Sequence, residues 1–300
     1  MIKMKESEIL ALASNSINDL TDKIIDVVDI KRPHSIDYAM NLAKVVSKLS
    51  PLIGNMIEFT TVDLLNEKEW KGLGKWERQD PGFPDATFNS TKVVPNPGIE
   101  IKAWFPFATE ITARFKESQN IFKENPFINV ALIAWLPEPE YIIWGKPQII
   151  GTLVVSGDSV AKARDTHYHK PPQYIVLEPE DTRERTGNLQ QTNTNGFKFQ
   201  EDKSNIQDAT RIVRSWGADK LFYNPDEVYQ KMLKILQGQF VYRLDTNYAK
   251  IDRIEHKEIE AFKTKIENTI FHGKTIKEWS RLLSGKVDDT ILRKEIKTII

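Results

Sequence analysis

The sequence contains no cysteine among its 300 residues. This absence excludes disulfide bonds, thiolate zinc sites and cysteine nucleophiles, and it fits a reducing cytoplasm. No apolar run approaches the roughly 18 residues that a membrane-spanning helix needs, and the apolar run near the N-terminus is too short for a signal peptide. We therefore expect a cytoplasmic protein with no membrane association.

The sequence also lacks a net charge, because 42 Lys and Arg residues balance 42 Asp and Glu residues. This balance argues against a surface coated with non-specific nucleic-acid contacts, although it permits a locally positive cleft. A glycine-rich phosphate loop and internal repeats are absent as well. The 300 residues are enough for one large domain or two modest ones, and the hydrophobic fraction of 40% is ordinary for a globular protein.

Hydrophobic periodicity predicts an α/β protein that is helical at both ends. Apolar residues at spacings of three and four predict helices over residues 6–28, 35–49, 52–64, 109–122, 224–238, 254–270 and 275–285, with a last helix from about residue 288. Alternating or continuous apolar runs predict strands over residues 99–103, 127–136, 141–144, 148–155 and 174–177. We expect a catalytic domain over residues 1–221 and a helical C-terminal subdomain over residues 222–300.

The chemistry is concentrated between residues 80 and 103. Asp85 follows Pro84, and fourteen residues separate it from Glu100, which begins the tripeptide Glu-Ile-Lys. Because strand side chains alternate between faces, Glu100 and Lys102 point the same way. Asp85 can reach the same place from a neighbouring strand. The two carboxylates then form a candidate site for a divalent cation, with a lysine beside it.

These residues resemble the PD-(D/E)xK nuclease superfamily, whose largest branch is the type II restriction endonucleases. The tripeptide alone is uninformative, because Asp or Glu two residues before Lys recurs elsewhere in the chain; the preceding Pro-Asp, the nearby glycine and the apolar flanks distinguish this copy. The resemblance implies a restriction-endonuclease-like mixed central sheet flanked by helices. It also implies that Asp85, Glu100 and the carbonyl of Ile101 hold Mg²⁺, while Lys102 orients or deprotonates the attacking water.

Two further segments are included in the resemblance. The helix after Pro51 carries Glu58, which in similar enzymes contributes another carboxylate, although a solvent-facing helix residue is an equally good interpretation. The expected helix over residues 109–122 carries Arg114 and Lys116, which we interpret as phosphate contacts or as a solvated helix face.

Residues 164–195 are rich in side chains that can read base edges. Asn and Gln pair with adenine and Arg with guanine in the major groove. We expect sequence recognition here, unless the segment is only a polar surface loop. The candidate DNA-binding residues are Arg164, His167, Tyr168, His169, Arg183, Arg185, Gln190, Gln191, Asn193 and Asn195.

The resemblance implies a sequence-specific, Mg²⁺-dependent deoxyribonuclease that cuts double-stranded DNA and leaves 5′-phosphate ends. It further implies a homodimer and a cognate DNA methyltransferase as functional companion. Two alternatives stay open at this point: a DNA-repair nicking endonuclease, and a non-catalytic DNA- or protein-binding module in which the acidic pair is only structural.

Overall fold

The structure, a computed structural model, describes residues 4–108, 110–168, 174–178, 196–200, 242–243, 250–284 and 287–300. The chain divides into two units. The first comprises Met1–Ala113, Glu124–Ser159 and His256–Ile300, and the second comprises Arg114–Lys123 and Val160–Glu255. The expected domain boundary between residues 221 and 222 lies outside the described residues. Residues 256–300 belong to the unit that contains the central sheet.

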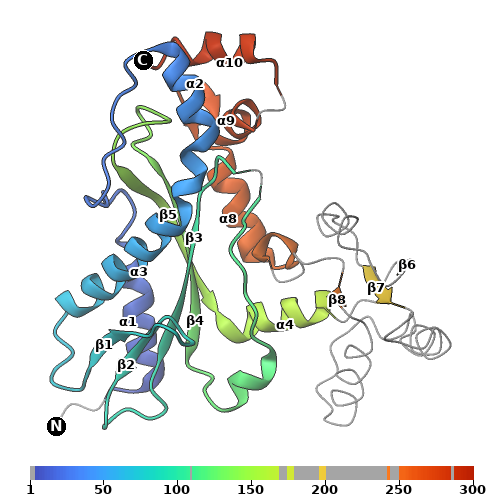
Figure 1. Ribbon diagram of the computed structural model, residues 1–300. Helices are drawn as coiled ribbons and strands as arrows, with labels where there is room; N and C mark the ends of the chain where they lie inside the picture. Colours follow the sequence, from blue (N-terminus) through green and yellow to red (C-terminus); the bar gives the residue numbers. More distant parts are fainter. Residues whose placement is uncertain are drawn as a thin grey trace. The chain divides into compact units, whose positions relative to one another are not determined.

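A five-stranded mixed sheet forms the centre of the first unit (Figure 1). Its strands are β1 (Lys75–Arg78), β2 (Ala86–Asn89), β3 (Gly98–Trp104), β4 (Ile128–Pro137) and β5 (Pro147–Ser156), in the spatial order β1-β2-β3-β4-β5. The β3–β4 pair is parallel and the other pairs are antiparallel. β4 is almost entirely buried, because it lies between two strands and both of its faces are covered. The expected buried central strand is thus confirmed.

Helices cover both faces of this sheet (Figure 1). On one face lie α1 (Glu6–Asn18) and α3 (Ser50–Glu67), and a Cβ added to Gly54 of α3 would lie 3.6 Å from Ala103 Cβ. On the other face lies α8 (Lys257–Glu267), whose Phe262 ring is 6.2 Å from the ring of Trp104. Since Ala103 and Trp104 are neighbours on one strand, their side chains point to opposite faces. The chain is therefore mixed α/β with helices on both sides of the sheet.

Capping residues define several of the remaining helices. Ser35 caps α2 (Ile36–Val45), which is followed by the 3-10 turn η1 (Val46–Leu49). A short hairpin of β9 (Ile270–Phe271) and β10 (Lys274–Thr275) leads into α9 (Ile276–Leu283), where Thr275 and Glu278 form a capping box. Asp288 caps α10 (Asp289–Ile296). The helix starts expected near residues 35, 275 and 288 are confirmed.

The expected helix over residues 6–28 is wrong beyond residue 18. Asp22 has a φ of 71°, and the segment after it pairs with the free edge of β5: Ile25 N donates to Pro147 O at 2.7 Å and Ile149 N donates to Lys23 O at 2.9 Å. This pairing satisfies backbone groups of an edge strand, a tertiary gain that overrides local helical periodicity. It leaves Ile24 and Val27 exposed, although both were expected to face inward.

The expected helix over residues 109–122 is also wrong. Of the described residues 110–122, residues 111–118 form neither helix nor strand apart from an isolated bridge at Arg114, and a 3-10 turn, η2, spans Gln119–Lys123. Ile111 and Phe115 are buried while Thr112, Arg114 and Lys116 are exposed. A spacing of four residues between apolar side chains is not unique to helices, and here Ile111 and Phe115 are buried by an irregular segment.

The expected strand over residues 141–144 is a turn instead. Ile142 has a φ of 64°, and the rings of Tyr141 and Trp144 stack at 3.7 Å. Ile142 and Ile143 are fully buried, which explains why this short apolar run was mistaken for a strand. The strand expected directly after it is present as β5.

The second unit includes η2, the part of α4 (Gly157–Tyr168) from Val160 onward and a three-stranded sheet in the order β6-β7-β8. Its strands are β6 (Tyr174–Glu178), β7 (Gly196–Gln200) and β8 (Tyr242–Arg243), and a 3-10 turn, η4 (Ile251–Arg253), follows. β6 confirms the strand expected at residues 174–177. The helix expected from residue 224 lies outside the described residues. Within the described part of the chain, no helix combines the length and the apolar character needed to cross a membrane.

Candidate active site

Two neighbouring strands bring the predicted acids together. β2 runs antiparallel to β3 with Ala86 opposite Ile99, so Asp85, immediately before β2, lies opposite Glu100. The Asp85 backbone N–H donates to Glu100 Oε2 at 3.1 Å, and the Ile101 backbone N–H donates to Asp85 Oδ2 at 2.7 Å. Each carboxylate therefore accepts a hydrogen bond from the backbone of the neighbouring segment. These two hydrogen bonds fix the distance between the two carboxylates.

Gly98 permits this approach. A Cβ added at Gly98 would lie 2.3 Å from Pro84 Cγ, well inside van der Waals contact. The buried proline ring occupies the space where a side chain would stand, and this packing places Asp85 beside β3. The glycine just before the tripeptide in the sequence thus has a steric reason.

Lys102 completes the cluster from the same face of β3 as Glu100. Its Nζ lies 2.5 Å from Glu100 Oε1 and 3.3 Å from Asp85 Oδ2. The three side chains are 15% (Lys102), 11% (Glu100) and 17% (Asp85) exposed. The structure therefore brings together the three residues that the sequence singled out.

Burial and mutual charge perturb the ionisation of this cluster. Burial raises the pKa of Glu100 to about 7; the charge of Lys102 opposes this rise and that of Asp85 adds to it. For Lys102 burial alone would lower the pKa, but the negative charges of Glu100 and Asp85 outweigh burial and raise it. Such perturbed groups in one cluster are typical of functional sites.

The donor set of the cluster fits a hard divalent cation. Carboxylate and carbonyl oxygens together with water are the ligands that Mg²⁺ prefers. The N–H of Ile101 points toward Asp85, and a residue's N–H and C=O point to the same edge of its strand, so the Ile101 carbonyl faces that edge too. Within the described residues, no three His, Asp or Glu side chains gather closely enough to hold a metal ion. A cation here would depend on two carboxylates, a carbonyl and water.

Glu58 lies next to the cluster and is paired with an arginine. Arg78 of β1 donates to Glu58 Oε2 through Nε at 3.1 Å and Nη2 at 2.9 Å, and to Asp80 Oδ2 through Nη1 at 2.9 Å. Burial raises the pKa of Glu58, the hydrogen bond from Arg78 opposes the rise, and the charge of Asp85 adds to it. Glu58 is thus close enough to Asp85 for their charges to interact.

Sequence reasoning missed Arg78. Its guanidinium packs over the ring of Phe59 at 4.5 Å and links α3 to the segment leading to Asp85. The partners lie 20 residues before it and two residues after it, and no local pattern in the sequence connects them. The sequence gives a single indication of its role, which is that Arg78 is a cation located six residues before the Pro84-Asp85 pair.

The predicted DNA-binding residues divide into three groups. Arg114 and Lys116 are exposed, as contacts to a phosphate backbone require, although they lie on an irregular segment and not on the expected helix. Arg164 is buried and its Nη1 lies 2.6 Å from Asp165 Oδ1, which favours a structural role for this side chain; His167 is partly buried. The side chain of Tyr168 and all of His169, Arg183, Arg185, Gln190, Gln191, Asn193 and Asn195 lie outside the described residues.

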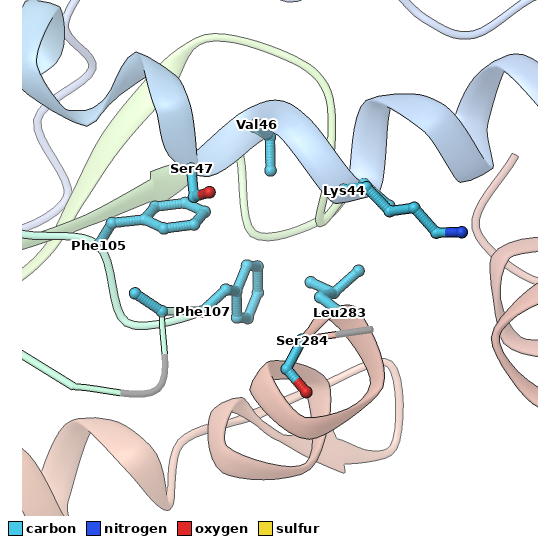
Figure 2. A pocket seen from close by; sticks show the side chains of 9 residues that line it. Lys44, Val46, Ser47, Phe105, Phe107, Leu283 and Ser284 are labelled. Carbon is cyan, nitrogen blue, oxygen red and sulfur yellow. The ribbon is translucent and has the colours of Figure 1, made fainter. Parts of the chain in front are cut away.

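A separate cavity of about 310 Å³ lies in the first unit, between η1, the segment after β3 and the end of α9 (Figure 2). Val46, Phe105, Phe107 and Leu283 make up its apolar lining, and Lys44 lies at its edge. None of Asp85, Glu100 and Lys102 lines it. The cavity is therefore distinct from the acidic cluster and offers no carboxylate.

Comparison of the chain with protein-family models, with curated proteins and with solved structures gave no match.

Proposed function

We propose that the chain is a Mg²⁺-dependent deoxyribonuclease of the restriction type, which hydrolyses phosphodiester bonds of duplex DNA at a specific sequence. The observation that carries the proposal is the meeting of Asp85, Glu100 and Lys102 beside the Ile101 backbone, in contact with one another and largely buried. A solvated acidic pair on an edge strand, the structural alternative, would be more exposed. The five-stranded mixed sheet with helices on both faces is consistent with a restriction-endonuclease-like fold.

The chemistry follows from the donor set. Asp85, Glu100 and the Ile101 carbonyl would hold Mg²⁺, which supplies stabilisation of negative charge on the phosphoryl oxygens. Lys102 Nζ has three rotatable N–H donors and can orient the attacking water. The water gives up a proton to solvent as its oxygen bonds to phosphorus in line with the leaving group; the P–O3′ bond breaks, and the 3′ oxygen takes up a proton from solvent. The products are a 5′-phosphate and a 3′-hydroxyl.

Digestion of a long natural duplex DNA tests the proposal. With Mg²⁺ we expect discrete fragments, and with EDTA we expect intact DNA. Asp85→Asn, purified in parallel, controls for contaminating nucleases and should leave the DNA intact. A smear instead of bands would support the nuclease activity but contradict sequence specificity. Intact DNA with the wild-type protein, across several divalent cations and several natural DNAs, would contradict the proposed function.

A further inference from the structure

The ammonium group of Lys102 lies between the two acids of the site. Its Nζ contacts Glu100 Oε1 at 2.5 Å and Asp85 Oδ2 at 3.3 Å, while the other contacts of these carboxylates are backbone N–H groups. Among the described residues, no other cation forms an ion pair with Asp85 or Glu100. Arg78, a cation on the nearby strand β1, is bound by Glu58 and Asp80.

This arrangement gives Lys102 the position that a metal ion would need. Both carboxylates are at least four-fifths buried, so their charges require a nearby cation. A divalent ion added beside the ammonium would place three positive charges against two negative ones in a poorly hydrated cluster. Repulsion at such short range is strong when solvent screening is weak. The two cations therefore compete for the same oxygens.

We infer that Lys102 is the internal counter-cation of the carboxylate pair and that a divalent cation binds by displacing it. This inference rests on the proposed function, because it assumes that the pair binds a metal ion. The long, flexible lysine side chain allows Nζ to leave the carboxylates without movement of β3. Displacement would release its N–H donors toward water and a phosphate oxygen, so that loading of the cation and freeing of the lysine occur in one step.

The ammonium group itself supplies the first test. A ¹H–¹⁵N spectrum of the lysine ammonium groups, with Lys102 assigned by its loss in Lys102→Arg, should show a resonance protected from exchange by its two carboxylate partners. Titration with Ca²⁺, chosen to avoid DNA cleavage, should shift or broaden this resonance in step with the binding measured by calorimetry. The resonance of Lys75, an exposed lysine on β1 paired with Glu77, should not respond. A Lys102 resonance that stays unchanged while Ca²⁺ saturates the site would overturn the inference.

Removal of the charge supplies the second test. Lys102→Met keeps the unbranched, flexible stem of the side chain but removes the competing cation, so Ca²⁺ should bind at least about tenfold more tightly than it binds the wild-type protein. The matched control, Lys75→Met, should bind Ca²⁺ like the wild type. Equal or weaker binding by a folded Lys102→Met protein would contradict displacement. Should this variant not fold, the spectrum of the wild-type protein decides.

The two tests separate this inference from the proposed function. Ca²⁺ binding that Asp85→Asn abolishes, together with Mg²⁺-dependent cleavage, supports the proposed function whatever Lys102 does. The inference alone fails if the metal binds and the ammonium stays in place. If calorimetry detects no divalent cation on the wild-type protein, both fail.

Discussion

At the scale of single residues, the proposed function depends on the charges of two acids. Asp85→Asn and Glu100→Gln preserve side-chain volume and remove a charge that a cation needs, so each should abolish cleavage. The folded state should persist, because the amides can still accept the backbone hydrogen bonds. A single-turnover cleavage assay with Mg²⁺ measures the effect. Near wild-type cleavage by either variant would contradict the assignment.

Glu77→Gln is a suitable control for these two variants. Glu77 lies on β1 with its side chain 40% exposed, and its partners are Lys75 and Asn89 and not the cluster. Its substitution should leave both cleavage and metal binding unchanged. A comparable loss of cleavage in this variant would mean that removing any acidic charge from this part of the sheet impairs cleavage. The specific role assigned to Asp85 and Glu100 would then be wrong.

The raised pKa of Glu100 predicts a pH dependence of stability in EDTA. Its pKa rises from 4.5 in the unfolded chain to about 7 in the folded protein, so the folded state binds more protons between these values. The contribution of Glu100 to the free energy of unfolding therefore falls as pH rises from about 4.5 to about 7. Relative to Glu100→Gln, the wild-type protein should lose stability across this window in urea unfolding. Parallel pH profiles of the two proteins would contradict the raised pKa.

Arg78 is a residue for which the structure predicts an effect and the sequence does not. Arg78→Met removes four hydrogen bonds and leaves Glu58 without its ion-pair partner, at an expected cost of about 1–3 kcal/mol in the free energy of unfolding. Arg78→Lys keeps the charge and should recover part of this loss. If Arg78 acts through Glu58, the double variant with Glu58→Gln should be less destabilised than the sum of the single variants. Additive effects would show that the two side chains act independently.

At the scale of elements, the site depends on how closely the segment before β2 approaches β3. Gly98→Ala places a Cβ against the Pro84 ring, so the ring and the adjacent Asp85 must shift. We expect a loss of about 1–3 kcal/mol in stability, typical of overpacking, together with weaker Ca²⁺ binding in calorimetry. Gly54→Ala is the matched control: its Cβ would lie at an ordinary 3.6 Å from Ala103, and alanine favours a helix. Unchanged Ca²⁺ affinity in Gly98→Ala would show that Pro84 does not position Asp85.

The elements also show how far the sequence alone reaches. The strand carrying Glu100 and the helix caps at Ser35 and Thr275 were predictable, because their signals are local. The strand shows alternating side chains, and each helix shows a Ser or Thr directly before a helical pattern of apolar residues. The irregular segment at residues 111–118 was not, since an apolar spacing of four residues also occurs outside helices. The end of α1 was not either, because it depends on pairing with β5, far away in the sequence. The acids of the site were predictable because they belong to a local sequence motif. Arg78 was not, because its contact with Glu58 joins residues that are 20 positions apart.

At the scale of the whole molecule, the division of the chain separates the proposed chemistry from the expected recognition. Asp85, Glu100 and Lys102 belong to the first unit, whereas residues 164–195, rich in Arg, Asn and Gln, belong to the second. Changes in the second unit should therefore alter the choice of DNA sequence without altering metal binding in the first. Lys116, an exposed cation of the second unit, serves to distinguish base recognition from general attraction to phosphate.

Single alanine substitutions at Arg183, Arg185, Gln190 and Asn193 test this separation. Each should reduce the discrimination between the target and single-base-pair variants by about 1–3 kcal/mol, because base-edge hydrogen bonds carry the specificity. Lys116→Ala should instead weaken binding to all sequences alike and reduce the salt dependence, as loss of a phosphate contact does. Competition binding with Ca²⁺ in place of Mg²⁺ measures both quantities, and calorimetry on the same variants should give the wild-type Ca²⁺ affinity. Unchanged discrimination in all four variants would show that residues 164–195 are a polar surface, and recognition would then have to come from another part of the chain.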